Sequence, residues 1–226
     1  MLRPNHHPVN KAGLVGWWDY ANTGSVSALG TWKDYSGNGN DATLYSTANV
    51  NNTGIVLVPN SYGSIDATDF KISGDFSVSF WLKHNTSGSS WSRIIDFSNY
   101  SSTQSGWMFN YRSYSGDVEF RITNVITWES LKISSADMTS GNWYHITGTF
   151  NNTTKTGKIY LDGVLKDTET GSGVVSYTDI NYLGFGARLN TAPMEYANVT
   201  IDDIQIYERE LLVGEIMQNY LKSMRA

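Results

Sequence analysis

Cysteine is absent from this chain of 226 residues, so it has no disulfide, no thiol nucleophile and no cysteine-based metal site. Charged residues are also scarce: they make up 16% of the chain, and the formal net charge is −5. Binding to nucleic-acid phosphates depends on clustered Lys and Arg. This charge balance therefore argues against a nucleic-acid partner.

Long apolar runs are missing as well. No stretch approaches the roughly 20 consecutive apolar residues of a membrane-spanning helix, so we expect no membrane partner. The opening MLRPNHHPVNKAG has no apolar segment of the kind found in a secretory signal peptide. Residues 1–12 are polar, include Pro4 and Pro8 and show no periodicity, which predicts a flexible N-terminal arm. Such an arm is either a disordered tail or a segment that orders against a neighbouring subunit.

The pattern that is present is alternation with a period of two, which is typical of strands with one buried face. It is clearest in residues 76–83, where every second residue is apolar. Residues 107–112 and 118–122 alternate on either side of the turn SYSG, which predicts a hairpin. Many short strands without β-α-β alternation predict a single all-β sandwich over residues 13–226.

Only one segment, residues 215–224, has the apolar spacing of a convincing helix. The apolar stripe of this helix consists of Ile216, Met217, Tyr220, Leu221 and Met224. Lys222 and Arg225 near its end suit the negative pole of the helix dipole.

Three stretches together form a recognisable pattern. Residues 32–44 (WKDYSGNGNDATL) contain a Gly- and Asn-rich turn, and residues 141–165 (GNWYHITGTFNNTTKTGKIYLDGVL) read as a hairpin. Residues 199–223 (VTIDDIQIYERELLVGEIMQNYLKS) read as a closing strand followed by a helix. In this order they resemble the laminin G-like branch of the concanavalin A-like lectin and glucanase superfamily, across residues 13–224. The resemblance implies an all-β, two-sheet antiparallel jelly roll with a short C-terminal helix, and it specifies a fold rather than a function.

The closing segment EIMQNYLKS is also similar to stand-alone laminin G-like proteins carried on bacteriophage particles. This similarity implies a virion surface protein that is made in the host cytoplasm and attached to capsid or tail proteins. Viral surface symmetry favours a trimer. The alternative location is extracellular.

Members of this superfamily commonly hold one calcium ion between the Gly- and Asn-rich loop and the acidic pair of the closing strand. The resemblance implies a structural calcium site made by Asp34, Asn38, Asn40 and one of Asp202 or Asp203. Asp202 shares its phase with the apolar residues of its strand, so we prefer Asp203, although a bulge would reverse this choice. The alternative is that Asp34 and Asn38 only cap a turn.

No catalytic constellation is evident, so we expect no enzyme. The closely spaced carboxylate triplet of the superfamily's glucanases is missing, and Asp117 and Glu119 are the nearest approach to it. Retaining glycosidases hold two carboxyls about 5–5.5 Å apart, but the turn SYSG beside this pair favours a solvated strand end. His145 has no accompanying nucleophile motif such as G-x-S-x-G, and the family often places a packing histidine here.

Aromatic residues are the best candidates for a binding surface, because sugar rings stack on exposed aromatic faces. The candidates are Trp81, Trp91, Trp107, Tyr111 and Trp128. Trp81 falls on the polar phase of its strand, opposite the core-facing Phe80 and Leu82. Sugar hydroxyls can be bound nearby by Arg93, Asn110 and Arg112. The alternative for each tryptophan is packing in the core or under a loop, which is what we expect for Trp17, Trp18 and Trp143.

Two classes of function remain. The domain is a virion surface component, as a capsid decoration or a tail- or fibre-associated protein, or it is a carbohydrate-binding module or lectin. The two are compatible, since a decoration protein can bind glycans on the host surface. A glycosidase is a distant third.

Overall fold

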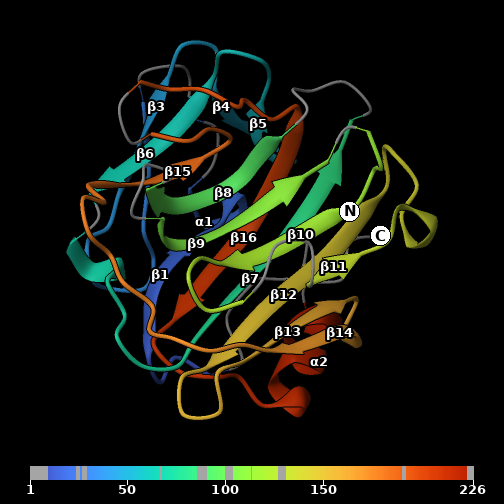
Figure 1. The fold of residues 1–226 in the computed structure, drawn as a ribbon. Helices are drawn as coiled ribbons and strands as arrows, with labels where there is room; N and C mark the ends of the chain where they lie inside the picture. Colours follow the sequence, from blue (N-terminus) through green and yellow to red (C-terminus); the bar gives the residue numbers. More distant parts are fainter. Residues whose placement is uncertain are drawn as a thin grey trace.

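The structure is a computed structural model, and it describes residues 10–23, 26, 30–66, 68–85, 91–99, 104–112, 114–126, 131–189 and 192–222. Nearly all of its regular structure is β, in two antiparallel sheets of eight strands each that stack as a sandwich (Figure 1). The predicted two-sheet antiparallel sandwich is therefore confirmed. Within the described ranges, no helix is long and apolar enough to cross a membrane.

The first sheet has seven strands in a continuous path, and an eighth strand, β1, pairs with β16. In spatial order the path is β14 (Val164–Thr170), β13 (Thr156–Leu161), β12 (Trp143–Asn151), β7 (Phe76–His84), β16 (Val199–Tyr207), β5 (Gly54–Leu57) and β4 (Asn49–Asn51), with β1 at Leu14–Trp18. The predicted hairpin of residues 141–165 is present as the paired strands β12 and β13.

The second sheet has eight strands in one path and faces the first across the core. In spatial order they are β11 (Lys132–Ile133), β10 (Val118–Ile122), β9 (Ser105–Tyr111), β8 (Ser92–Asn99), β15 (Tyr182–Phe185), β6 (Tyr62–Asp66), β3 (Ala42–Tyr45) and β2 (Thr31–Trp32). The hairpin predicted around SYSG is confirmed as β9 and β10.

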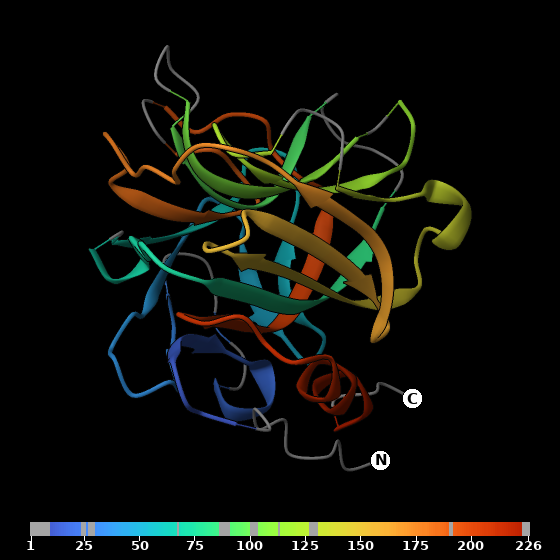
Figure 2. The same cartoon turned by 60° about the horizontal axis from the view of Figure 1, so that its bottom comes forward.

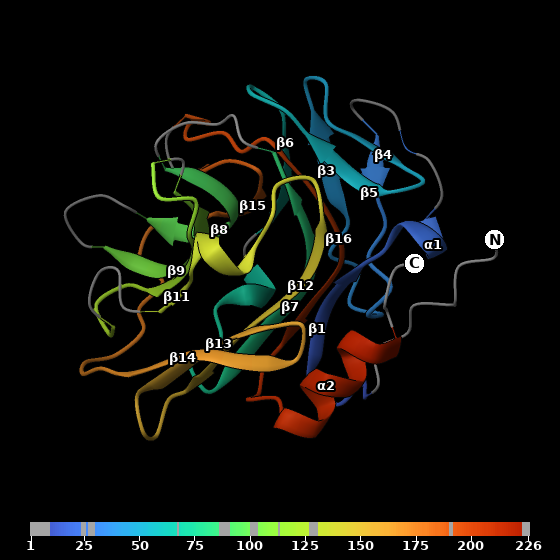
Figure 3. The same ribbon diagram turned by 90° about the vertical axis from the view of Figure 1, so that its right-hand side faces the viewer.

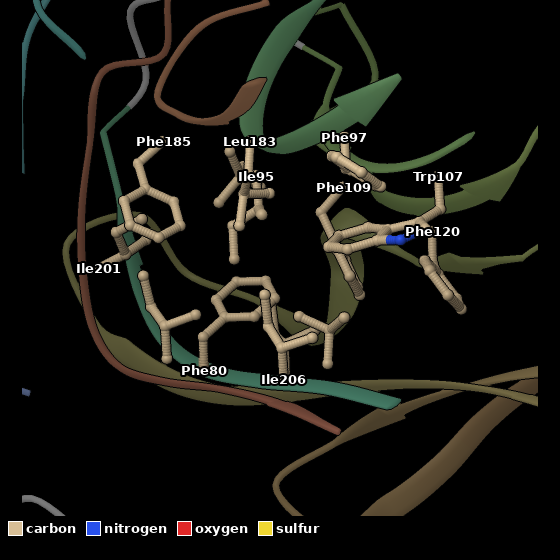
Figure 4. Close-up of a cluster of buried hydrophobic side chains, with 14 of the residues drawn as sticks. Phe80, Ile95, Phe97, Trp107, Phe109, Phe120, Leu183, Phe185, Ile201 and Ile206 are labelled. Carbon is tan, nitrogen blue, oxygen red and sulfur yellow. The ribbon is translucent and has the colours of Figure 1, made fainter. Parts of the chain in front are cut away.

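The core lies between the sheets and is rich in aromatic rings (Figure 4). Phe80 of the first sheet packs edge-on against Phe109 of the second, with ring centroids 4.9 Å apart. Phe109 in turn stacks on Phe120 at 4.6 Å. Burying one side chain of this size stabilises the fold by roughly 1.5–3 kcal/mol relative to leaving it exposed. Because large apolar residues recur at every second position, this energy favours turning the same face of each strand inward.

Among the described residues, the helical segments are α1 (Tyr20–Thr23), α2 (Val213–Lys222) and two 3-10 turns at Thr68–Phe70 and Ser135–Asp137. The predicted C-terminal helix is confirmed, but its buried stripe differs from the expected one. Ile216 and Asn219 are its buried residues, whereas Leu221 is 56% exposed. The amide of Asn219 donates to the Gln205 side chain (3.2 Å), so this polar residue faces the sheet. Met224 and Arg225 lie outside the described residues.

Helix α2 packs on the outer face of the first sheet, close to strand β1 of that sheet (Figures 2 and 3). A second apolar cluster forms there, and its buried members are Leu14, Trp17, Tyr160, Tyr207, Leu211 and Ile216. The segment that precedes β1 is held near this cluster, because the Arg209 guanidinium donates to the backbone oxygen of Ala12 (2.7 Å). Residues 1–9 of the predicted arm lie outside the described residues. The outer face of the second sheet has no helix packed on it among the described elements.

A bulge in β16 changes the direction of one predicted ligand. The register with β7 shifts between Asp202 and Gln205, and Asp203 adopts a positive φ of 47°. Asp202 therefore pairs with Trp81 and accepts a hydrogen bond from the Tyr20 amide (2.9 Å), instead of pointing into the core as its phase predicted. Both aspartates are buried on the covered outer face of the first sheet.

Candidate functional site

Three tyrosines project from the outer face of the second sheet. In β3 and β6 the small and apolar residues turn inward, so Tyr45 and Tyr62 turn outward as direct cross-strand partners. Their rings are nearly parallel, 10° apart, with centroids separated by 4.7 Å. Tyr182, at the start of β15, is on the same face and is 50% exposed.

These rings line a pocket of about 260 Å³, which we call the tyrosine pocket. Its lining residues are Tyr45, Tyr62, Ser64, Tyr182, Leu189 and Pro193. Burial and the neighbouring Tyr45 and Tyr196 raise the pKa of Tyr62, so its hydroxyl is a neutral hydrogen-bonding group around pH 7. The pocket thus combines flat aromatic faces with hydroxyl groups.

The wall opposite the sheet comes from the loop that follows β15. A Cβ on Gly184 would lie 2.4 Å from the backbone oxygen of Ala187 and 3.0 Å from Leu189, so the loop approaches this strand because position 184 has no side chain. Further along, the Tyr196 hydroxyl donates to the backbone oxygen of Pro193 (3.0 Å). Leu189 and Pro193 are thereby held over the tyrosines.

Beside the pocket, a charged cluster fastens this loop to β8. The Arg93 guanidinium contacts the Asp96 carboxylate at 3.3 Å and the Glu195 carboxylate at 2.6 Å, and it donates to the Asn110 side-chain oxygen (2.5 Å). Arg93 and Asp96 are each 2% exposed. Burial raises the pKa of Asp96 to about 6, and the nearby Arg93 opposes this rise. The Arg93 amide also donates to the Glu195 backbone oxygen (2.8 Å), so the cluster positions the pocket wall.

Of the predicted ligand-binding residues, Trp91 and Arg112 lie together. The Arg112 guanidinium stacks over the ring of Trp91 at 4.8 Å and over that of Tyr114 at 5.3 Å. It also forms an ion pair with Glu119 at 2.9 Å, and Arg112 is only 3% exposed. Tyr114, which the sequence interpretation passed over, is 62% exposed. Arg112 therefore packs beneath the rings of Trp91 and Tyr114, and its charge is paired with Glu119.

Trp81, Trp107 and Tyr111, which were also predicted to contact a ligand, are buried, so none of them offers an exposed aromatic face. Trp107 is 0% exposed and packs between Phe76 and Phe97. Tyr111 is 6% exposed and packs its ring against His84, at 4.8 Å.

Trp81 does point to the polar phase of its strand, as predicted, but helix α2 covers it. Its ring lies 6.0 Å from that of Tyr220 and 5.4 Å from that of His145, and it is 3% exposed. Trp128 lies outside the described residues. The structure also buries Trp17 and Trp18, as the packing interpretation predicted.

The predicted calcium loop is closed by its own hydrogen bonds. The Asp34 carboxylate accepts from the backbone amides of Trp17 (2.9 Å), Ser36 (2.8 Å) and Asn40 (3.0 Å), and it also accepts from the Ser36 hydroxyl (2.7 Å). Four donors therefore converge on one carboxylate. This is the turn-capping arrangement left open as the alternative.

The remaining three predicted ligands do not complete a calcium site. The side-chain amide nitrogens of Asn38 and Asn40 donate to the Val15 carbonyl oxygen (3.2 and 2.9 Å). Each amide therefore faces this carbonyl with its N–H group and not with its oxygen. Asp203 accepts from the indole of Trp17 (2.9 Å), so this ring lies between it and the loop. Calcium needs six to eight converging oxygens. As placed, these residues do not fit the ion.

The candidate catalytic groups are engaged in structural contacts. Asp117 accepts from the Ser135 amide (2.9 Å), while Glu119 pairs with Arg112 and is completely buried rather than solvated. His145 shares a hydrogen bond with the Ser79 hydroxyl (2.9 Å), and burial lowers the pKa of His145 to about 3. It is therefore neutral near pH 7 and packs beneath α2.

Sequence interpretation missed the tyrosine pocket, although a signal was available. In the strands ATLY and YGSID, Tyr45 and Tyr62 fall on the phase opposite the inward residues, as the period-two rule predicts. Most of the predicted binding residues are tryptophans, and Trp81 and Trp107 are buried. For Tyr45 and Tyr62, the phase within the strand indicates the exposed face.

A sequence profile described as the concanavalin A-like lectin/glucanases superfamily matches residues 58–217. This match covers β6, β15 and the pocket-wall loop, and it excludes Tyr45. A comparison with curated protein sequences finds no significant match.

Solved structures with this fold include the binding domain of botulinum neurotoxin DC in complex with SialylT, at a TM-score of 0.70 and 18% identity over 95% of this chain and 52% of that one. The same binding domain in complex with rat synaptotagmin II has a TM-score of 0.71 and 18% sequence identity, over 96% of this chain and 53% of that one. A Trypanosoma rangeli sialidase mutant displaying trans-sialidase activity has a TM-score of 0.71 and 18% sequence identity, over 94% of this chain and 33% of that one. The chain thus spans about half of the toxin domains and a third of the sialidase, and these similarities establish a shared fold.

Proposed function

The chain belongs to the concanavalin A-like lectin/glucanases superfamily, and from this premise we propose that it is a non-catalytic carbohydrate-binding domain whose ligand occupies the tyrosine pocket. The observation that supports the proposal is the group of three tyrosines on the outer face of the second sheet, the face opposite the one on which α2 packs. Aromatic faces suit the C–H surfaces of sugar rings, while tyrosine hydroxyls and Ser64 suit their hydroxyls.

The charge of the pocket indicates the kind of sugar unit it takes. Its six lining residues include no Asp, Glu, Lys, Arg or His, and the carboxylate of Glu195 on the wall loop is paired with Arg93 (2.6 Å). An uncharged ring therefore fits this pocket better than an acidic one, because a carboxylate placed there would lose hydration without gaining a cation.

The same face supports a binding role over hydrolysis. Its buried carboxylates are committed to cations or backbone amides: Asp96 to Arg93, Glu119 to Arg112, and Asp117 to the Ser135 amide. None of the three lines the tyrosine pocket. A glycosidase requires two carboxyls that flank the bound sugar, so we propose that the domain binds glycans without cleaving them.

A glycan array probed with the purified protein tests the proposal. We expect specific hits, and we expect Tyr182→Ala to weaken them about tenfold or more, which corresponds to 1.4 kcal/mol of lost stacking and contact. The control is Leu212→Ala, which truncates a side chain that is 70% exposed next to α2. Equal binding by both variants, or hydrolysis of the bound glycan, would contradict the proposal.

The virion setting is a further proposal that rests on the phage-like ending of the sequence. In that setting the domain is attached to capsid or tail proteins and presents the tyrosine pocket to glycans of the host surface. Co-purification with phage particles and a trimer in light scattering are the expected results. A monomer that never accompanies particles would contradict this setting, while the glycan-binding proposal would stand.

A further inference from the structure

The loop that follows β15, which we call the wall loop, covers the buried carboxyl group of Asp96. Its described residues are 186–189 and 192–196. Asp96 lies in β8, pairs with Gly184 of β15 and is 2% exposed. The loop lies over this pair, because a Cβ on Gly184 would be 2.4 Å from the Ala187 backbone oxygen and 3.0 Å from Leu189. Leu189 and Pro193 also line the tyrosine pocket, so the loop that covers Asp96 is the loop that forms the pocket wall.

The charged groups around Asp96 come from its own strand and from the wall loop. In β8, the Arg93 guanidinium lies 3.3 Å from the Asp96 carboxylate, and the Ser98 hydroxyl and amide donate to this carboxylate (3.0 and 3.1 Å). In the wall loop, the Glu195 carboxylate contacts the Arg93 guanidinium at 2.6 Å, and Arg188 lies 3.7 Å from Glu195. When Asp96 is ionised, two carboxylates therefore share one guanidinium.

The residues that pair with Asp96 on the neighbouring strands are not titratable: they are Met108 of β9 and Gly184 of β15. Asn110 of β9, which accepts from Arg93 (2.5 Å), is uncharged as well. One strand further, Arg121 of β10 pairs with Met108. Arginine keeps its charge at every pH at which proteins are studied, so a change of charge in this row near pH 6 belongs to Asp96.

Burial couples the charge of Asp96 to the position of the wall loop. It raises the pKa of Asp96 to about 6, against an ordinary value of 3.8, and the charge of Glu195 adds to the rise. Arg93 and Ser98 oppose the rise. Because the loop supplies both the cover and Glu195, the docked loop favours the protonated carboxyl. By linkage, the protonated carboxyl favours the docked loop to the same extent.

We propose that Asp96 is a positioning residue that makes glycan binding at the tyrosine pocket tighter at mildly acidic pH, because its protonated carboxyl favours the docked wall loop. The proposal rests on the carbohydrate-binding role above and names how that same site is regulated. When the loop is docked for a larger share of the time, Leu189 and Pro193 are in place more often, and the apparent affinity follows that share. The affinity rises as the pH falls through about 6 and levels off near pH 4.

Glycan affinity at pH 7.5 and pH 5 tests the proposal, with the uncharged oligosaccharide that gives the strongest array signal as the ligand. We expect the wild type to bind about three- to tenfold more tightly at pH 5, because one pH unit below the midpoint of a titration shifts a linked equilibrium by at most about tenfold. Asp96→Asn has no charge at either pH, so it should bind at pH 7.5 as tightly as the wild type does at pH 5. Asp69→Asn removes an exposed carboxyl and should keep the wild-type difference.

Amide hydrogen exchange of the glycan-free protein measures the wall loop directly. The Arg93 amide donates to the Glu195 carbonyl (2.8 Å) and the Gly186 amide to the Ile94 carbonyl (3.0 Å), so both bonds join the loop to β8. After correction for the pH dependence of intrinsic exchange, we expect these amides to be about threefold or more better protected at pH 5 than at pH 7.5. In Asp96→Asn the protection should be equal at the two pH values. Thermal unfolding at both pH values checks that each variant is folded.

The outcomes separate this proposal from the carbohydrate-binding role. An affinity that is the same at both pH values, equal protection of the wild-type loop at both, or a pH dependence that persists in Asp96→Asn would overturn the regulation by Asp96 and leave the tyrosine pocket in place. A blank array from folded protein whose loop protection does follow pH would overturn glycan binding, whereas the coupling between Asp96 and the wall loop would stand.

Discussion

At the scale of single residues, the outer face of the second sheet combines accessible tyrosines with buried ions. Tyr45 and Tyr182 are 36% and 50% exposed, whereas Arg93 and Asp96 are 2% exposed. A ligand reaching this face meets aromatic rings first. The charged cluster contributes by holding the loop that walls the pocket, through both the side chain and the backbone of Glu195.

The buried carboxyl of Asp96 predicts a particular pH dependence of stability. Its folded-state pKa is about 6 against an ordinary value of 3.8, so the folded protein binds a proton more readily than the unfolded chain. The resulting stabilisation is complete below about pH 4 and is lost as the pH rises through 6. Between those limits the wild type should lose up to roughly 3 kcal/mol relative to Asp96→Asn, since one pKa unit is about 1.4 kcal/mol.

Chemical denaturation of both proteins from pH 4 to pH 7 measures this difference. His145, with its pKa lowered to about 3, destabilises the folded state at acidic pH, but it is present in both proteins and cancels. Asp69→Asn is the control for the loss of one exposed carboxyl. A wild type that gains stability relative to Asp96→Asn as the pH rises from 4 to 6 would contradict the assignment.

Sequence predicted the direction of many side chains better than their accessibility. The phase of Trp81 was correct, because strand periodicity is a local property of the backbone. Its burial was not predictable from that phase, because α2 arrives from more than 130 residues further along the chain. Trp107 was misjudged for a different reason: its own strand turns it inward.

At the scale of elements, the turn of residues 34–41 ties β1 to the second sheet. The Asp34 carboxylate satisfies the Trp17 amide of β1 and the Asn40 amide of its own turn, while the Trp18 indole donates to the Asn40 carbonyl (2.9 Å). The sequence motif identified this turn correctly. The sequence did not show whether a calcium ion or hydrogen bonds stabilise this turn, because the same oxygen-rich residues can form a metal site or cap a turn.

Asp34→Ala should therefore destabilise the fold by about 3 kcal/mol, because several amides lose their acceptor at once. Since the carboxylate already has four donors, we expect the melting temperature to be unchanged by calcium or by a chelator, in the wild type and in the variant alike. Thermal unfolding with each additive measures this. A wild-type melting temperature that rises with calcium, and does so no longer in Asp34→Ala, would restore the family's calcium site.

The helix α2 is held by one buried apolar side chain above all. Ile216 is 0% exposed and packs in the cluster with Trp17 and Tyr207. Ile216→Ala should cost about 2–5 kcal/mol, as large-to-small substitutions in cores do, and it should expose Trp81. Leu221→Ala, at a position that is 56% exposed, should change the free energy of unfolding by less than about 0.5 kcal/mol. Denaturant unfolding followed by tryptophan fluorescence reports both, and equal effects would contradict this packing.

At the scale of the whole molecule, the sandwich has two different outer faces. Helix α2 packs on the outer face of the first sheet (Figure 2). The tyrosine pocket lies on the outer face of the second sheet. Sequence motifs predicted the fold because they reflect its turns and its closing strand, which are local in the chain. The tyrosine pocket combines residues from β3 and β6 with residues of β15 and the loop after it, which lie more than 100 residues further along the chain, so no single motif contains them.

The central claim is that ligands bind on the second sheet, at the tyrosine pocket. The most direct measurement is backbone NMR of isotope-labelled protein titrated with the strongest glycan from the array. The account predicts shifted amide signals in β3, β6, β15 and the loop that contains Pro193, with α2 and β1 unchanged. Shifts confined to α2, β1 or the Asp34 turn would contradict it.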